Sequence, residues 1–271
     1  MGSPRKMSPE QKAFLNALRA DLSAFKVEVR RKNKDKQLVL EAIDDHDGGG
    51  KIFEAFLVFR LKANLEAAGF TTEICDAAGH ASKRFILRGA PGHLRRKAQR
   101  AGVAEPGFIA IFVNGYDGFE LHNSVEWPDH LMGDGECHEF DVSVASSTTC
   151  TELANWYRTK GAGPSPVLGV EAKFHGGAPG KNLAREVTGL AVRMRTPLIY
   201  LVSSKLASPS VRKQLEALSR VIALDTKIID AGAIDVTMNA GVIDASKLSR
   251  ISDEIVKQIE ATIMVAENAL T

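Results

Sequence analysis

The pattern of hydrophobic and polar positions divides the chain into a helical beginning, a series of strands, and a second half in which helices and strands alternate. Apolar residues recur at helical spacing after a capping sequence and predict an amphipathic helix over residues 9–26. A second helix is expected to begin at Lys51 and to end near Gly69, a typical helix-terminating glycine. Because this helix is apolar nearly all round its first turns, we expect it to be buried.

Short apolar or alternating runs predict the strands that follow the second helix. Three are expected near residues 70–75, 84–88 and 108–113, and a fourth over 119–126. The later part alternates between helix and strand, which favours parallel strands joined by helical crossovers. The elements expected there are a helix near 181–194, a strand at 198–202, a helix near 209–219, a strand at 221–224 and an edge strand within 227–236.

These elements are expected to form one core with an extension at each end. Residues 1–47 would hold the N-terminal helix and a basic connector, residues 48–230 the core, and residues 231–271 a C-terminal helical extension. Within the extension, isoleucines at a repeat of four predict a helix over 246–268 that packs on the core or on a partner. These isoleucines are Ile251, Ile255, Ile259 and Ile263.

Two strand-patterned runs carry charge where a strand core should be apolar. Asp141 stands in the first run, residues 138–144, and Glu171 and Lys173 share one face of the second, residues 167–174. If the runs pair as neighbours with their polar faces aligned, two carboxylates and a lysine converge. Burying such groups costs several kcal/mol unless something compensates, and a divalent cation is one candidate. The alternative is a cross-strand ion pair on a solvated sheet face.

Glu54, in the apolar second helix, extends this charged set. A glutamate on that face needs a partner, although a role in complementing the helix dipole is the alternative. Three carboxylates and a backbone carbonyl such as that of Ala172 offer hard oxygen ligands, which suit Mg²⁺, with Mn²⁺ as a substitute. Lys173 is placed to orient or deprotonate a water molecule and to stabilise charge on a phosphate. The set indicates metal-assisted hydrolysis of a phosphodiester.

This arrangement resembles the PD-(D/E)xK nuclease superfamily, over roughly residues 50–225. The resemblance rests on His138–Val142 and Val170–Lys173, which look like its signature strands, and on Lys51–Glu54, which looks like the opening of its first core helix. It implies an α/β, restriction-endonuclease-like fold: a central mixed β-sheet flanked by helices, to which this chain adds N-terminal and C-terminal helical extensions.

The resemblance also implies roles for the site residues. Asp141 and Glu171 would be metal ligands and Lys173 the catalytic lysine, while Glu54 would be an additional ligand or a water-orienting acid. The long spacer between the two runs leaves Asp134 as an alternative to Asp141. We prefer Asp141, because it lies inside a predicted strand whereas Asp134 lies in a Gly-Asp-Gly turn.

Charge is unevenly distributed along the chain, although the formal net charge is only +2. Residues 101–150 hold nine Asp or Glu and no Lys or Arg, between basic flanks. This suits a polyanion guided to a site where cations are bound. Two basic runs are candidates for phosphate contact, with a solvated connector or helix face as the alternative. Their members are Arg30, Arg31 and Lys32 in the first run and Arg95, Arg96 and Lys97 in the second.

The cysteines and the hydropathy of the chain indicate its cellular compartment. Cys75, Cys137 and Cys150 lack C-x-x-C spacing, which predicts neither a disulfide framework nor a structural zinc site and favours a reducing cytoplasm. No apolar run approaches the roughly 18 residues of a membrane span. We therefore expect a cytoplasmic protein without a membrane partner.

Together these features predict a Mg²⁺-dependent endonuclease that hydrolyses DNA. The resemblance makes restriction or antiviral defence in a prokaryote a reasonable setting, and because one site hydrolyses one strand, double-strand cutting favours a homodimer. Two alternatives stay open: a nucleic-acid-binding or assembly module with a nuclease-like fold and no hydrolysis, and an RNA-specific or structure-specific nuclease.

Overall fold

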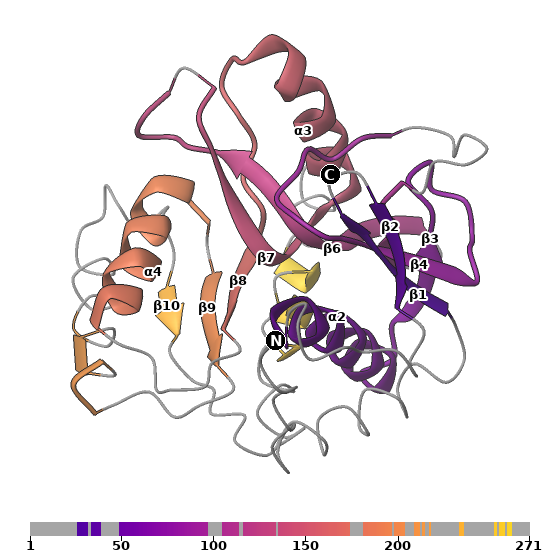
Figure 1. Ribbon diagram of the computed structural model, residues 1–271, viewed down its shortest axis with the longest axis horizontal. Coiled ribbons are helices and arrows are strands. Elements are labelled where there is room, and N and C mark those ends of the chain that lie inside the picture. Colours follow the sequence, from indigo (N-terminus) through magenta and orange to yellow (C-terminus); the bar gives the residue numbers. More distant parts are fainter. Residues whose placement is uncertain are drawn as a thin grey trace, which may run out of the picture.

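The computed structural model describes residues 26–31, 34–38, 49–96, 105–113, 116–133, 135–173, 181–196 and 198–203, with short pieces within 209–217, at 233–235 and within 252–261. Its centre is a mixed sheet of seven strands in the order β10-β9-β8-β7-β6-β5-β3 (Figure 1). These strands are β3 (Thr71–Cys75), β5 (Phe108–Val113), β6 (Tyr116–Pro128), β7 (Cys137–Ser146), β8 (Leu168–Lys173), β9 (Leu198–Ser203) and β10 (Ala233–Asp235).

The sheet has an antiparallel half and a parallel half. Neighbouring strands run antiparallel from β3 through to β8, whereas β8, β9 and β10 are parallel to one another. Helix α4 (Lys181–Met194) connects β8 to β9, as the alternating pattern predicted. The edge strand expected within 227–236 is confirmed as β10. The strand expected at 221–224 lies outside the described residues.

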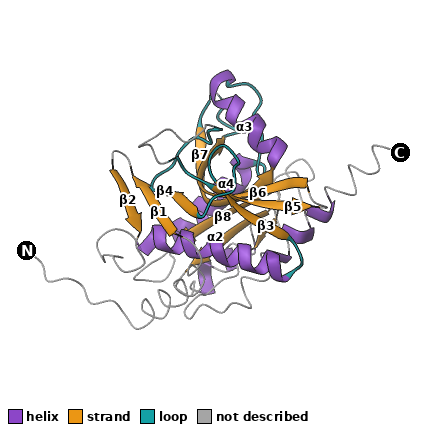
Figure 2. Ribbon diagram, turned by 90° about the vertical axis from the view of Figure 1, so that its right-hand side faces the viewer, coloured by secondary structure: helices purple, strands orange, loops and turns teal. Residues whose placement is uncertain are grey.

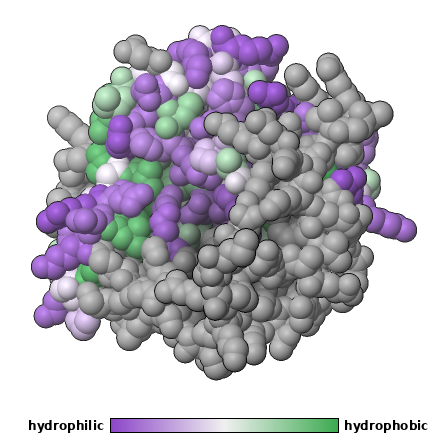
Figure 3. All heavy atoms as spheres, in the orientation of Figure 1, coloured by the Kyte–Doolittle hydropathy of each residue, from purple (hydrophilic) through white to green (hydrophobic). Residues whose placement is uncertain are grey.

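Helices cover both faces of the sheet. Helix α2 (Gly49–Ala67) runs along one face (Figure 2), and the core on that side includes Tyr200 and Val202 of β9. The adjacent residues of β9, Ile199 and Leu201, point to the other face, where α3 (Ser147–Thr159) and α4 pack. Over α3, the surface at the top of Figure 3 is largely polar. The chain is therefore an α/β protein with a mixed sheet between helical layers.

The prediction for α2 is confirmed. Every residue from Phe53 to Phe59 is buried, and Gly69 follows the helix with a positive φ of 98°. The C-terminal isoleucines are placed in part: Ile255 and Ile259 are fully buried in the core beneath α2, whereas Ile251 and Ile263 lie outside the described residues. Among the described residues, no helix is long and apolar enough to cross a membrane.

Arg30 and Arg31, which the sequence assigned to a basic connector, lie in a strand instead. A second sheet of three strands, in the order β2-β1-β4, is formed by β1 (Lys26–Arg31), β2 (Lys34–Leu38) and β4 (Arg84–Arg88). The first two strands make an antiparallel hairpin, and β1 runs parallel to β4. Lys26–Arg31 alternates polar and apolar residues, which suits a strand once β4 offers backbone partners. The helix predicted over 9–26 lies outside the described residues except for Lys26, which begins β1.

Candidate active site

The two charged runs are neighbours in the sheet. Strands β7 and β8 pair antiparallel, with Val142 opposite Val170. One residue beyond this pair, Asp141 Oδ2 accepts a hydrogen bond from the backbone N–H of Ala172 at 2.7 Å. The Asp141 side chain thus takes the place of a backbone acceptor, which holds it beside the end of β8.

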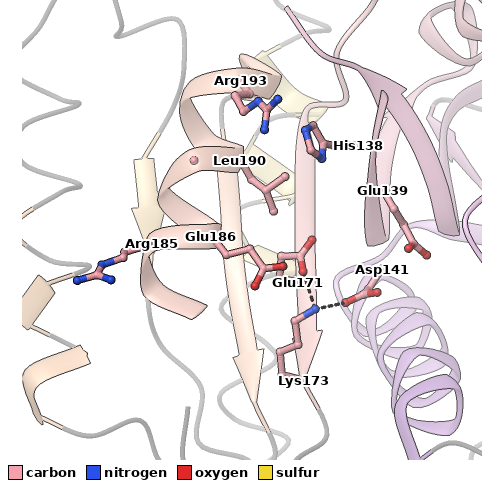
Figure 4. A pocket seen from close by; sticks show the side chains of 10 residues that line it. His138, Glu139, Asp141, Glu171, Lys173, Arg185, Glu186, Leu190 and Arg193 are labelled. Atoms are coloured by element: carbon pink, nitrogen blue, oxygen red, sulfur yellow. Dashed lines mark ion pairs between the residues drawn. The ribbon is translucent and has the colours of Figure 1, made fainter. Parts of the chain in front are cut away.

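Lys173 joins the two carboxylates (Figure 4). Its Nζ lies 2.9 Å from Glu171 Oε2 and 3.6 Å from Asp141 Oδ2. Glu171 is 5% exposed, so this is not an ion pair on a solvated sheet face. The convergence predicted from the strand pattern is confirmed.

Burial and mutual repulsion disfavour the negative charges of the two carboxylates. Burial raises the pKa of Glu171 well above its usual range, the charge of Asp141 raises it further, and Lys173 partly offsets both. Burial lowers the pKa of Lys173, but Glu171 and Asp141 outweigh it and raise that pKa overall. The two carboxylates therefore favour the charged ammonium form of Lys173 in this arrangement.

Glu54 lies on the other side of Asp141, where α2 meets β6. Its Oε1 is 2.6 Å from Lys51 Nζ, and its Oε2 accepts hydrogen bonds from Ser124 Oγ at 2.8 Å and Asn123 Nδ2 at 3.3 Å. The pKa of Glu54 is raised to about 7. Burial is the largest cause, Lys51 opposes it, and the charge of Asp141 adds to it. Because Glu54 is 4% exposed and held by these groups, a role limited to the helix dipole does not describe it.

Sequence reasoning missed the residues that hold Glu54. Lys51 Nζ also contacts Ser124 Oγ at 2.5 Å and Glu139 Oε1 at 3.6 Å, so it links α2 to β6 and β7. Ser124 has a φ of 49°, a conformation that residues other than glycine rarely adopt. The i,i+3 spacing of Lys51 and Glu54 was a readable signal for the first contact. Nothing in the sequence marked the backbone of Ser124.

A cavity of about 440 Å³ opens beside the carboxylates and includes residues of β7, β8 and α4. Both Arg185 and Glu186, which the sequence placed on the helix after the site, line it and are exposed. The lining residues are His138, Glu139, Asp141, Glu171, Lys173, Arg185, Glu186, Gly189, Leu190 and Arg193.

One end of the cavity is braced by a buried aspartate, Asp129, which the sequence pattern did not single out. Asp129 Oδ2 lies 2.7 Å from Arg193 Nε and 3.3 Å from His138 Nε2. The other oxygen of Asp129 accepts hydrogen bonds from the backbone N–H groups of Leu131 and Met132. Asp129 therefore ties the β6–β7 turn to α4 and to the cavity.

The predicted phosphate-contacting residues are placed only in part. Arg95 is exposed, but Arg96 is paired with the buried Glu120 and lies 4.9 Å from the centre of the Phe108 ring. Arg30 and Arg31 lie in β1, without described side chains. The remaining sequence candidates, Lys32, Lys97 and Asp134, lie outside the described residues.

The donor set fits a hard divalent cation. Asp141 and Glu171 share a single lysine, and the burial of Glu171 leaves its negative charge poorly compensated. Four carboxylates and three cationic side chains line the cavity. Carboxylate oxygens in this number suit Mg²⁺ or Mn²⁺.

Comparisons with protein-family models, curated proteins and solved structures find no match to this chain.

Proposed function

We propose that this protein is a Mg²⁺-dependent endonuclease that hydrolyses DNA phosphodiester bonds, with a restriction-endonuclease-like fold and a PD-(D/E)xK-type site. The observation that carries the proposal is the meeting of Asp141, Glu171 and Lys173 at the end of the β7–β8 pair, beside a cavity. Restriction or antiviral defence is the setting that the family resemblance favours.

Asp141 and Glu171 would hold the cation, with Glu54 as a further ligand or as a water-orienting acid. When bound, Mg²⁺ supplies Lewis acidity and makes water a competent nucleophile near neutral pH. Mn²⁺ has the same preference for oxygen ligands and would serve as a substitute.

The chain's own residues supply the remaining electrostatics. Lys173 carries a positive charge next to both carboxylates and would stabilise the negative charge that develops on the scissile phosphate. Arg185 has an exposed guanidinium group that is directed away from the carboxylates (Figure 4), so it would make bidentate contact with a DNA phosphate outside the catalytic centre. Asp129 keeps Arg193 oriented at the other end of the cavity.

The test is plasmid cleavage in the presence of Mg²⁺ by three variants, Asp141→Asn, Glu171→Gln and Lys173→Met. Each removes a charge with little change in volume, and we expect each to lower the cleavage rate by at least about 100-fold. Glu152→Gln, which changes an exposed acid of α3 outside the cavity, is the matched control and should cut at the wild-type rate.

EDTA-sensitive cutting at wild-type rate by all three variants would contradict the assignment. A panel of single-stranded, duplex and branched DNA, together with RNA, then separates a DNA endonuclease from an RNA-specific or structure-specific one. Metal-independent binding without cleavage of any substrate would instead identify a binding or assembly module.

A further inference from the structure

A second cluster of ligand-type side chains lies outside the cavity, between β6 and the first turn of α3. Glu120 and His122 are two residues apart on β6 and project from the same face. Cys150 reaches them from α3, whose start is fixed by Ser146, the side chain of which accepts a hydrogen bond from the N–H of Thr149. Residues remote in sequence are thereby brought together in the core.

The three side chains are close enough to bind one ion. His122 Nε2 lies 2.8 Å from Glu120 Oε2 and 3.7 Å from Cys150 Sγ, and all three ligand atoms lie within 4.8 Å of one another. In a tetrahedral site with metal–ligand bonds of 2.0–2.3 Å, neighbouring ligand atoms are about 3.3–3.7 Å apart. Small side-chain shifts therefore suffice to bind an ion.

The cluster is buried, and its ligand atoms face one another. Each of the three residues is at most 3% exposed. Arg96 pairs with Glu120 Oε1, so that Oε2 remains turned toward the imidazole. The imidazole turns Nε2 toward both of the other ligand atoms, whereas its buried Nδ1 has no hydrogen-bond partner among the described residues.

We propose that Glu120, His122 and Cys150 form a Zn²⁺ site that joins β6 to α3. A thiolate, an imidazole and a carboxylate are a borderline-soft set, which selects zinc over the hard Mg²⁺ of the cavity. Binding releases the thiol proton of Cys150 to solvent and places the imidazole proton on Nδ1. The thiolate and the carboxylate then place two negative charges beside the ion, and Arg96 remains paired with Glu120 Oε1. The site does not depend on the proposed function.

The spacing of Glu120, His122 and Cys150 explains why the cysteine pattern predicted no zinc site. Zinc motifs recognised from sequence place pairs of ligands a few residues apart on both sides of a loop. Here Glu120 and His122 are two residues apart on one strand, and Cys150 comes from the first turn of a helix. Only the pairing of β6 with β7, from which α3 continues directly, brings Cys150 to this strand.

The experiment uses the full chain with excess Mg²⁺, so that the cavity does not compete for zinc. We expect one bound Zn²⁺ per chain by elemental analysis after dialysis, and Co²⁺ substitution should produce a thiolate-to-cobalt absorption band. Cys150→Ser should weaken Zn²⁺ binding by about tenfold or more and abolish the band. Cys137→Ser, which changes a half-buried cysteine outside the cluster, is the matched control and should bind as the wild type does.

The absorption band is measured on wild-type protein, so the test does not depend on the folding of a variant. Absence of stoichiometric zinc from the folded wild type would overturn the proposal. Stoichiometric zinc without a thiolate band, or zinc retained at full affinity by a folded Cys150→Ser protein, would overturn it equally.

Discussion

Single residues of the site are held by partners that come from other elements. Asp141 is positioned by the backbone of Ala172, and Glu54 by Lys51 together with Ser124 and Asn123. Groups of the protein itself therefore restrict the positions of both carboxylates. This preorganisation limits the reorganisation that binding would require.

The raised pKa of Glu54 predicts a pH-dependent effect of Glu54→Gln on stability. The pKa is about 7 in the folded protein and close to 4.5 when unfolded, so the folded state binds the proton more tightly and wild-type stability falls as pH rises through this interval. The glutamine has no such proton to lose. Its stability relative to wild type should therefore rise between about pH 4.5 and pH 7, by up to about 3 kcal/mol, and then level off.

Urea unfolding in EDTA across this pH range measures the difference directly. Glu152→Gln, which changes an exposed residue of α3, is the control. Its stability relative to wild type should change less with pH. A relative stability of Glu54→Gln that is constant or falls with pH would show that Glu54 is not a strained buried carboxyl.

Charge reversal on the exposed face of α4 should affect cleavage with little effect on stability. Arg185 is exposed on α4, so Arg185→Glu is expected to change stability by less than about 0.5 kcal/mol. If this guanidinium contacts DNA, the substitution places a negative charge against phosphate and should raise KM at least several-fold. Steady-state cleavage kinetics and thermal unfolding together test this, and an unchanged KM would remove Arg185 from the DNA-binding surface.

At the scale of elements, the junction of β7 and β8 decides where the charged groups meet. Gly169 of β8 lies against the Phe140 ring, and a Cβ at that position would be 2.5 Å from ring carbon Cε1. The two strands can pair at this distance because Gly169 has no side chain. Phe140 precedes Asp141 in β7, so this glycine accommodates the ring next to the site residue.

Gly169→Ala should consequently lower both stability and activity. Overpacking of this kind costs about 1–3 kcal/mol and would displace β8 relative to β7. Gly161→Ala is the matched control, because a Cβ there meets no atom within 4 Å. Thermal unfolding and plasmid cleavage report the two effects, and a Gly169→Ala protein with wild-type values for both would show that this contact does not position the site.

The elements that the sequence predicted well are those with a single strong pattern. The apolar run of α2, the alternation before Pro128 and the β8–α4–β9 sequence all gave the correct structure. The β1–β2 hairpin was missed because its basic residues hid a short alternation that becomes a strand only through pairing with β4. Likewise, Asp129 and Ser124 acquire their roles from contacts across the sheet, which no local pattern encodes.

At the scale of the whole molecule, Ile255 and Ile259 pack on the chain's own core, the first of the two alternatives for the isoleucine repeat, and are not available for a homodimer contact. Ile255 and Ile259 are 0% exposed within the chain's own core. A dimer is still expected if both DNA strands are cut, because each chain carries one site. Its contact must then involve other surfaces.

Gel filtration with light scattering, with and without duplex DNA, tests the dimer. The expected result is a mass of two chains on DNA and linear plasmid as the early product. A mass of one chain under both conditions, with nicked circles as the sole product, would exclude concerted double-strand cutting by a homodimer.

Among the described helices, α2 is both deeply buried and a carrier of site residues, because Lys51 and Glu54 lie on it and its residues 53–59 are all buried. Helix α4, by contrast, presents Arg185 and Glu186 from exposed positions. In a library of random variants, changes in α2 should reduce protein abundance and cleavage together. Changes on the exposed face of α4 should instead alter substrate choice at normal abundance, so new specificities would evolve there first.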